Sequence, residues 1–427
     1  MRSNLVVSIL AVVLLAQQST SALAQRHSRH LVHDLRIAFS AVSKRRYSND
    51  AVSTQQVLYC KNLRLGSGLQ SASTGHMVTA QSSSSTALAL SPTPATSTSS
   101  NGLPASTTIP ASSTSVAGDP AWTLVQTYTG STFFDGWQFW DSAIDGPDPT
   151  GGAVDYVNQA EAQMAGLIEI NDAGNAVIRV ETTPSVASNR KSIRITTQMS
   201  FTGGLVIMDS LHMPAGCGTW PAFWSTGPNW PAGGEIDVVE GVNDVLENQS
   251  TIHTSQGCTL PSSDPAQLNT TAAVVTADLN CVANLTETAG CWMQSGSNVS
   301  FGAGFNSIGG GVYAMKWDSE GISVWFFPRS IIPWDISSDN PVPDSWGLPV
   351  AHWPASTCNP EQYFSAHSAI FDISLCGQWA GTVWGTNCAT LTGFPTCEAF
   401  VAQQGVSFIE AYWEVKSLKF FNLTSVF

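Results

Sequence analysis

The sequence predicts an all-β protein built as a β-sandwich, preceded by a disordered segment rich in Ser and Thr. From residue 121 onward, short runs of alternating or β-branched residues recur between Gly, Pro, Asn and Asp. All 15 tryptophans lie in this part of the chain. Long helical periodicity is absent, and "CEAFVAQQ" at 397–404 predicts one short helix. Many short strands in one domain of about 300 residues favour two packed sheets.

The predicted strands follow one another along this domain. They are the runs at 175–183, 191–201, 204–213, 309–317, 321–328 and 412–421. The run "KWDSEGISVWFF" predicts a hairpin, because Asp318–Gly321 supplies polar turn residues between two strand patterns.

The first 120 residues predict no folded core. Residues 1–24 have the pattern of a secretory signal, with Arg2, an apolar run and the small-x-small sequence Ala22-Leu23-Ala24. Residues 25–120 are first basic and then rich in Ser, Thr and Pro, which predicts a disordered linker. We therefore expect a secreted protein, extracellular or in the cell wall, with a folded domain at 121–427.

The charge and the cysteines fit an exported protein. Nine of the 17 Lys and Arg but only three of the 31 acids precede Pro120, so the rest of the chain has a net charge of −20. Such a surface repels phosphate backbones, which argues against a nucleic-acid partner. Eight of the nine cysteines follow Pro120 and predict disulfides, but eight cysteines allow 105 pairings and we assign none. The N-x-S/T sequences at Asn248, Asn269, Asn284, Asn298 and Asn422 suit a glycosylated surface.

The run "GGEIDVVEGVND" at 233–244 places three acids in a pattern that is otherwise typical of a buried strand. On a regular strand Glu235 and Asp237 share one face and Glu240 points to the other. One extra residue between Asp237 and Glu240, a β-bulge, would bring all three acids to the same face. Two glutamates on one sheet surface fit a retaining glycosidase, in which one carboxylate is the nucleophile and the other the acid and base. The alternative is three surface acids on an edge strand.

Aromatic residues close to the acids predict a sugar-binding surface. Trp220, Trp224 and Trp230 precede the acid strand, and indole faces stack on the apolar faces of sugar rings. Each is equally well explained as part of the core. His253 would lie beside the acids if the run "STIHTSQGC" pairs with their strand, either as a partner of a carboxylate or as a structural histidine.

Five blocks in order resemble the fungal endo-1,3(4)-β-glucanases, or laminarinases, of glycoside hydrolase family 16. They are "GTWPAFWSTGPNWPAGGEIDVVEGVN", "TIHTSQGC", "GGGVYAMKW", "GISVWFFPRSIIPWDI" and "FDISLCGQWAG" with "AYWEVKSL". The resemblance implies a concanavalin-like β-jelly roll whose concave sheet binds glucan. It also implies a retaining mechanism with Glu235 as nucleophile, Glu240 as acid and base and Asp237 as their helper. Lys316 and Gln378 depart from residues that are frequent in the family, so the favoured linkage stays open.

Three functions remain possible on the sequence alone. The first is an endo-β-glucanase acting on β-1,3 or mixed β-1,3/1,4 glucan, and the second is a transglycosylase that uses the same site. The third, a non-catalytic lectin on the same sandwich, would need no paired glutamates. We expect a monomer with β-glucan as its partner, no membrane association and no cofactor or metal, since no clear ligand cluster for a structural calcium is visible.

Overall fold

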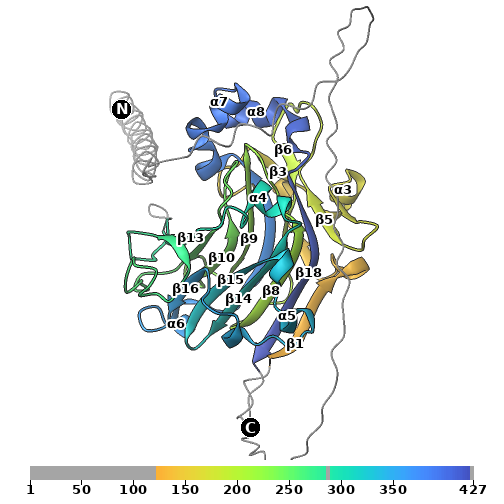
Figure 1. Cartoon of the computed structure of the whole chain (residues 1–427). Coiled ribbons are helices and arrows are strands. Elements are labelled where there is room, and N and C mark those ends of the chain that lie inside the picture. Colours follow the sequence, from red (N-terminus) through yellow and green to blue (C-terminus); the bar gives the residue numbers. More distant parts are fainter. Residues whose placement is uncertain (1–121, 285–288, 424–427) are drawn as a thin grey trace, which may run out of the picture. The chain divides into compact units, whose positions relative to one another are not determined.

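The computed structural model describes residues 122–284 and 289–423. The predicted signal peptide, the linker and Cys60 lie outside the described residues. Two sheets of eight strands make up the fold, and a short parallel pair accompanies them. The all-β sandwich predicted from the sequence is confirmed (Figure 1).

The first sheet, sheet A, has the strand order β16-β15-β14-β8-β18-β5-β4, and β1 pairs with β18. Its strands are β1 (Trp122–Thr129), β4 (Ile168–Ile170), β5 (Ala176–Arg179), β8 (Gly204–His212), β14 (Gly311–Asp318), β15 (Gly321–Pro328), β16 (Ala351–Pro354) and β18 (Tyr412–Leu423). The predicted hairpin is the β14–β15 pair, in which Asp318 lies opposite Gly321.

The second sheet, sheet B, has the order β12-β13-β11-β10-β9-β17-β7-β2. Its strands are β2 (Trp137–Phe139), β7 (Arg194–Thr197), β9 (Thr219–Thr226), β10 (Glu235–Glu240), β11 (Gln249–His253), β12 (Ala272–Val275), β13 (Cys291–Ser295) and β17 (Ser368–Leu375). All pairs in both sheets are antiparallel, whereas β3 (Val154–Tyr156) and β6 (Arg190–Ser192) pair in parallel.

The main core lies between the sheets. Phe223 and Phe371 of sheet B stack at a centroid distance of 4.6 Å, and Phe371 meets Trp413 of sheet A edge to face. The indole Nε1 of Trp413 also donates to the carbonyl of Asp372, which ties β18 to β17 across the layers. These contacts fix one face of sheet B against the core, so that its other face carries the polar residues described below.

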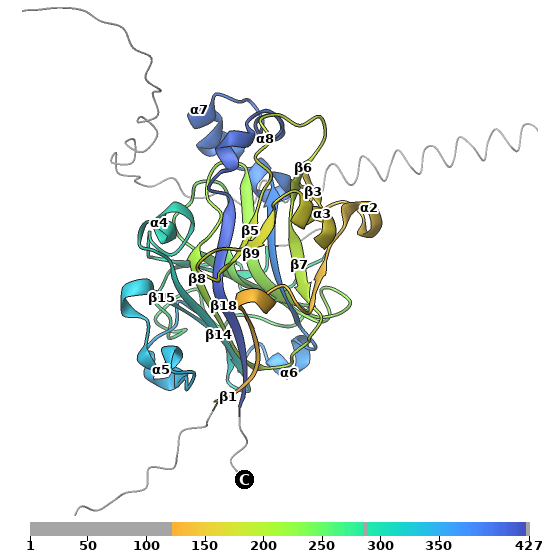
Figure 2. The same ribbon diagram turned by 90° about the vertical axis from the view of Figure 1, so that its right-hand side faces the viewer.

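Short helices cover the ends of the sheets. They are α2 (Ser142–Asp145), α3 (Gln159–Met164), α4 (Gly302–Ser307), α5 (Trp334–Ser337), α6 (Pro360–Tyr363), α7 (Cys388–Thr392) and α8 (Cys397–Gln403). The helix predicted at 397–404 is α8. Helices α7 and α8 lie at one end of the sandwich and α5 and α6 at the other (Figures 1 and 2). Within the described ranges, every helix is too short or too polar to span a bilayer.

Four disulfides use all eight cysteines that follow Pro120. The pairs are Cys217–Cys388, Cys258–Cys358, Cys281–Cys291 and Cys376–Cys397. The expectation of disulfides is confirmed, and the structure supplies the pairing that the sequence left open.

Candidate active site

Strand β10 carries the three acids, and the predicted bulge is present within it. Against β9, Asp237 pairs with Trp224 and Val239 with Phe223, so Val238 is the extra residue. Against β11, the register shifts between Asp237 and Glu240. A bulge of this kind reverses the side-chain alternation beyond it.

The contacts of Glu240 show that its side chain reaches the face that carries Asp237. Trp220 and Trp224 are four residues apart on β9 and therefore share a face, and Trp224 lies directly opposite Asp237. The indole Nε1 of Trp220 donates to Glu240 Oε1 at 2.8 Å. The bulge thus gathers Glu235, Asp237 and Glu240 on one face, as the sequence predicted.

Glycines at both ends of β10 let the strand pass close to two aromatic rings. Gly234 has φ +78°, and a Cβ atom there would lie 2.3 Å from Cδ1 of Phe364. A Cβ atom at Gly241 would lie 2.7 Å from Cε1 of Phe301. Larger residues would therefore push the ends of the acid strand outward, so the two glycines help to set the position of the glutamates beside them.

His253 lies beside the acids, because β11 pairs with β10 and places it opposite Glu235. Its Nε2 atom is 3.1 Å from Asp237 Oδ2 and 3.7 Å from Glu235 Oε1. The predicted neighbourhood of His253 is confirmed, and the imidazole contacts the carboxylates directly.

The three tryptophans contact the acids of the site in different ways. Trp230 is 41 % exposed, and its Nε1 donates to Glu235 Oε2 at 2.6 Å. Trp220 binds Glu240, as described above. Trp224 donates instead to Asp372 Oδ2 at 3.2 Å. Each glutamate therefore has an indole donor, and Trp224 belongs to a neighbouring part of the same face.

Burial raises the pKa values of the acids on this face. Burial, followed by the charge of Asp237, raises the pKa of Glu235 to about 8. Burial, followed by the charge of Glu240, raises the pKa of Asp237 well above its usual range. Carboxyl groups that repel one another in a buried place hold a proton between them near neutral pH.

Sequence reasoning missed a second polar group on the same face, next to β9. Asp372 of β17 lies opposite Ala222 and receives the Trp224 bond, and burial raises its pKa to about 7. The guanidinium of Arg194 lies 5.0 Å from the ring centre of Trp224 and 4.8 Å from that of Trp140. The signal in the sequence was an acid between the apolar residues of "FDISL", the same kind of pattern as in the acid strand.

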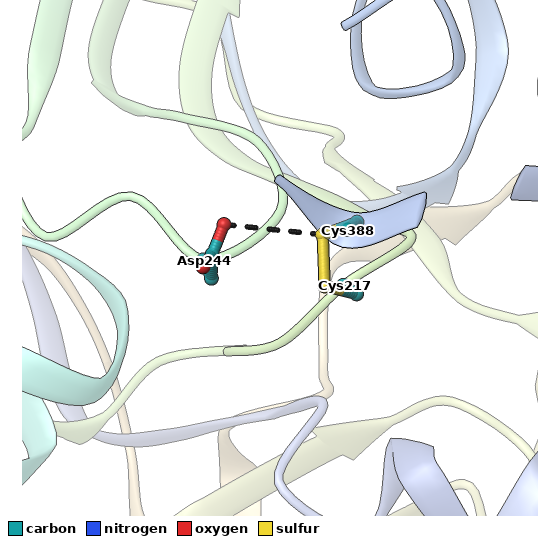
Figure 3. Close-up of side chains that lie close together, drawn as sticks. All are labelled: Cys217, Asp244 and Cys388. Carbon is teal, nitrogen blue, oxygen red and sulfur yellow. Dashed lines mark hydrogen bonds between the residues drawn. A yellow bond between two sulfur atoms is a disulfide. The ribbon is translucent and has the colours of Figure 1, made fainter. Parts of the chain in front are cut away.

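Two residue groups in the described part of the chain have the composition of a metal site. One is Glu235, Asp237 and His253, which coincides with the candidate catalytic residues. The other is Cys217, Asp244 and Cys388 (Figure 3). The two sulfurs of this group form a disulfide, so neither is a thiolate, and the 3.8 Å contact from Cys388 Sγ to Asp244 Oδ1 involves no thiol proton. This group therefore does not resemble a metal site, and its disulfide joins the segment before β9 to α7.

The two positions that depart from the resembled family lie outside the acid strand. Lys316, on β14 of sheet A, makes ion pairs with Asp318 at 2.7 Å and Glu320 at 3.6 Å. Gln378 is exposed, and its backbone N–H donates to the carbonyl of Thr150.

Comparisons with known proteins agree with this geometry. A family profile described as "XgeA-like, catalytic GH16 domain" matches residues 137–421. A probable glycosidase of Schizosaccharomyces pombe is 42 % identical over 300 residues, which are 70 % of this chain and 68 % of that protein. A probable endo-1,3(4)-beta-glucanase of Aspergillus fumigatus is 39 % identical over 307 residues, which are 70 % of this chain but only 45 % of that protein.

Two solved structures are similar to the described domain. One is an elongating GH family 16 beta-1,3-glucosyltransferase, with a TM-score of 0.64 and 37 % identity over 70 % of this chain and all of that one. The other is laminarinase 16A from Phanerochaete chrysosporium with beta-glucans in its donor and acceptor sites. It has a TM-score of 0.65 and 35 % identity over 71 % of this chain and all of that one. The jelly-roll fold expected from the sequence is thereby confirmed.

Proposed function

Since the chain belongs to glycoside hydrolase family 16 and is a glycoside hydrolase, we propose that it is a secreted endo-β-glucanase that cleaves β-1,3 or mixed β-1,3/1,4 glucan with retention of configuration. The observation that carries the proposal is the bulge at Val238, which brings Glu240 to the face of Glu235 and Asp237. Both glutamates then face the same bound sugar, as double displacement requires.

Glu235 is the nucleophile in this mechanism. It attacks the anomeric carbon and forms an ester with the sugar, while Glu240 donates its proton to the oxygen of the leaving chain. Glu240 then takes a proton from water, which attacks the same carbon and releases Glu235. The two inversions together retain the β configuration.

Asp237 supports the nucleophile by sharing a proton with it, because burial raises the pKa of both carboxyls. The reactive form of the pair is the one in which Asp237 carries that proton and Glu235 is the anion. In this form Asp237 donates to Glu235, and the indole N–H of Trp230 donates to the same carboxylate. The indole faces of Trp220, Trp224 and Trp230 provide the platforms for the sugar rings.

Secretion is part of the proposal because two features agree. The first 24 residues have the pattern of a signal peptide, and four disulfides require an oxidising compartment to form.

Transfer between glucan chains is the second candidate. The glucosyltransferase structure resembles this domain as closely as the laminarinase does, with TM-scores of 0.64 and 0.65. The same two glutamates serve both reactions, and the outcome depends on whether water or an acceptor sugar reaches the glycosyl-enzyme. Products longer than a supplied laminari-oligosaccharide would identify transfer.

The experiment that tests the proposal separates the two glutamates. Both Glu235→Ala and Glu240→Ala should lose activity on laminarin and barley glucan, by about 10²-fold or more for the acid/base. Azide should rescue Glu240→Ala on an aryl glycoside with a good leaving group to give the β-azide, because the glycosyl-enzyme still forms. It should rescue Glu235→Ala to give the α-azide by direct displacement. Azides of the opposite configurations would exchange the two roles, and full activity in both variants would overturn the proposal.

A further inference from the structure

Asn248 lies in an N-x-S sequence but is not at the surface. It is 1 % exposed, whereas Asn269, Asn298 and Asn422, which head three of the other such sequences, are exposed. The expectation that Asn248 belongs to a glycosylated surface is therefore wrong.

The side chain of Asn248 binds both sides of the bulge in the acid strand. Its Oδ1 accepts from the backbone N–H of Glu240 at 3.0 Å, and its Nδ2 donates to the carbonyl of Val238 at 3.0 Å. In the ladder with β11, Asp237 lies opposite Thr251 and Glu240 opposite Gln249, so Val238 and Val239 face Ser250 alone. The side-chain amide of Asn248 thus takes the place of a backbone partner where the ladder is interrupted.

Asn248 is itself held in place on every side. Its Nδ2 also donates to Ser250 Oγ at 3.2 Å, and that hydroxyl donates to the carbonyl of Val238 at 2.8 Å. Its backbone N–H donates to Ser300 Oγ at 2.9 Å, and its carbonyl accepts from the N–H of Ser295 at 2.8 Å. Both hydrogens of the amide group and its oxygen are engaged, so a sugar on Nδ2 would break this network.

We propose that Asn248 is a positioning residue for Glu240: it fixes the bulge that directs the acid/base carboxyl to its working face, and for this reason its nitrogen does not carry a glycan. This inference rests on the proposed role of Glu240. A displaced acid/base lowers the rate at which a poor leaving group departs but matters little for a leaving group that needs no proton.

The first test uses this dependence on the leaving group. Asn248→Ala should lower kcat/KM on laminarin by about 10²-fold, the typical effect of a displaced catalytic group. The same variant should keep nearly the wild-type kcat/KM on a dinitrophenyl β-glucoside substrate. An equal loss on both substrates, at a temperature where the variant is folded, would mean that Asn248 only supports the fold.

The second test uses Asn248→Asp, which has nearly the same shape. When protonated, the introduced carboxylic acid can donate to the Val238 carbonyl and accept from the Glu240 N–H, as the amide does. When ionised, it can no longer donate. Activity relative to wild type should therefore be highest at acid pH and fall as pH rises, whereas Asn248→Ala should be low at every pH. A pH-independent ratio for Asn248→Asp would count against the proposal.

The third test needs no variant at position 248. In wild-type protein made in a host that attaches N-linked glycans, peptide masses should show Asn248 unmodified. Asn298 lies in the same kind of sequence but is exposed, so Asn298→Gln is the matched control for the variants at position 248. It should leave kcat unchanged. A glycan on Asn248 in active enzyme would overturn the inference. Failure of the proposed function would look different, since Glu235→Ala and Glu240→Ala would then remain active.

Discussion

At the scale of single residues, the site is held together by donors placed against crowded carboxylates. Trp230 donates to Glu235, Trp220 donates to Glu240, and His253 Nε2 lies 3.1 Å from Asp237 Oδ2. Burial raises the pKa of Glu235, while the indole N–H of Trp230 acts in the opposite direction by stabilising the anion. The protonation of Glu235, the proposed nucleophile, therefore depends on Trp230 as well as on Asp237.

Trp230→Phe is expected to change the pH profile of activity. It keeps an aromatic face but removes the donor to Glu235, so the pKa of Glu235 should rise. Because the proposed nucleophile Glu235 must be ionised, the ascending limb of kcat/KM should move to higher pH. Trp224→Phe is the control, since its indole donates to Asp372 and not to Glu235 or Glu240. Identical ascending limbs in wild type and Trp230→Phe would show that the Trp230 indole does not lower the pKa of Glu235.

Glu235→Gln is expected to stabilise the fold at neutral and alkaline pH. The pKa of Glu235 is raised from 4.5 to about 8, so the folded state favours the protonated carboxyl. The resulting stability is fully present below the pKa of Glu235 in the unfolded chain, 4.5, where both states are protonated. It is lost as the pH rises from there through the pKa in the folded state, about 8. The variant should therefore melt higher than wild type near pH 8, by about 2 °C or more, and match it near pH 4. The measurement is thermal unfolding at both pH values. A lower Tm for the variant than for wild type at pH 8 would contradict the raised pKa of Glu235.

At the scale of elements, the acid strand shows what a sequence pattern can and cannot predict. The spacing of Glu235, Asp237 and Glu240 predicted both the strand and its bulge, because a regular strand cannot place all three on one face. The partner strand with His253 followed from the same reasoning. Asn248 was interpreted as a surface residue, because a short sequence motif carries no information about which backbone groups a bulge leaves unpaired.

The disulfides connect elements that are far apart in the chain, and their contributions should differ. In the chain-entropy account, closing a longer loop removes more freedom from the unfolded chain. Cys217–Cys388 spans 171 residues and Cys281–Cys291 spans 10. That account gives about 5 and about 3 kcal/mol for the two. Replacing Cys217 and Cys388 by Ala should therefore lower Tm more than replacing Cys281 and Cys291. The opposite order in calorimetry would contradict the chain-entropy account.

At the scale of the whole molecule, periodicity was sufficient for the fold class but not for the full surface around the site. Local patterns determine strands and hairpins, and so the sandwich followed from them. Asp372 and Arg194 lie far from the acid strand in the sequence, outside the run that contains the three acids. They meet Trp224 only because β17 and β7 follow β9 in sheet B. Sheet order and disulfide pairing are long-range properties, and one sequence alone does not specify them.

Truncation before Ala121 is expected to leave a folded and active domain. Residues 66–119 are dominated by Ser, Thr, Ala and Pro and cannot build a core, whereas the described domain has its own core between the two sheets. The truncated protein should unfold in one cooperative transition and keep the kcat of the full chain on laminarin. Loss of cooperative unfolding in the truncated protein would show that the boundary is misplaced.

The place of β10 within sheet B has a consequence for where a polymer is cut. Three strands lie on one side of β10 and four on the other. Neighbouring strands are about 4.8 Å apart, so the sheet extends about 14 Å to one side of the acids and about 19 Å to the other. Under the proposed function, we expect a glucan laid across the strands to be supported on both sides of the bond that breaks. Such an enzyme cuts long chains in their interior, and a glucan solution should lose viscosity well before free glucose accumulates.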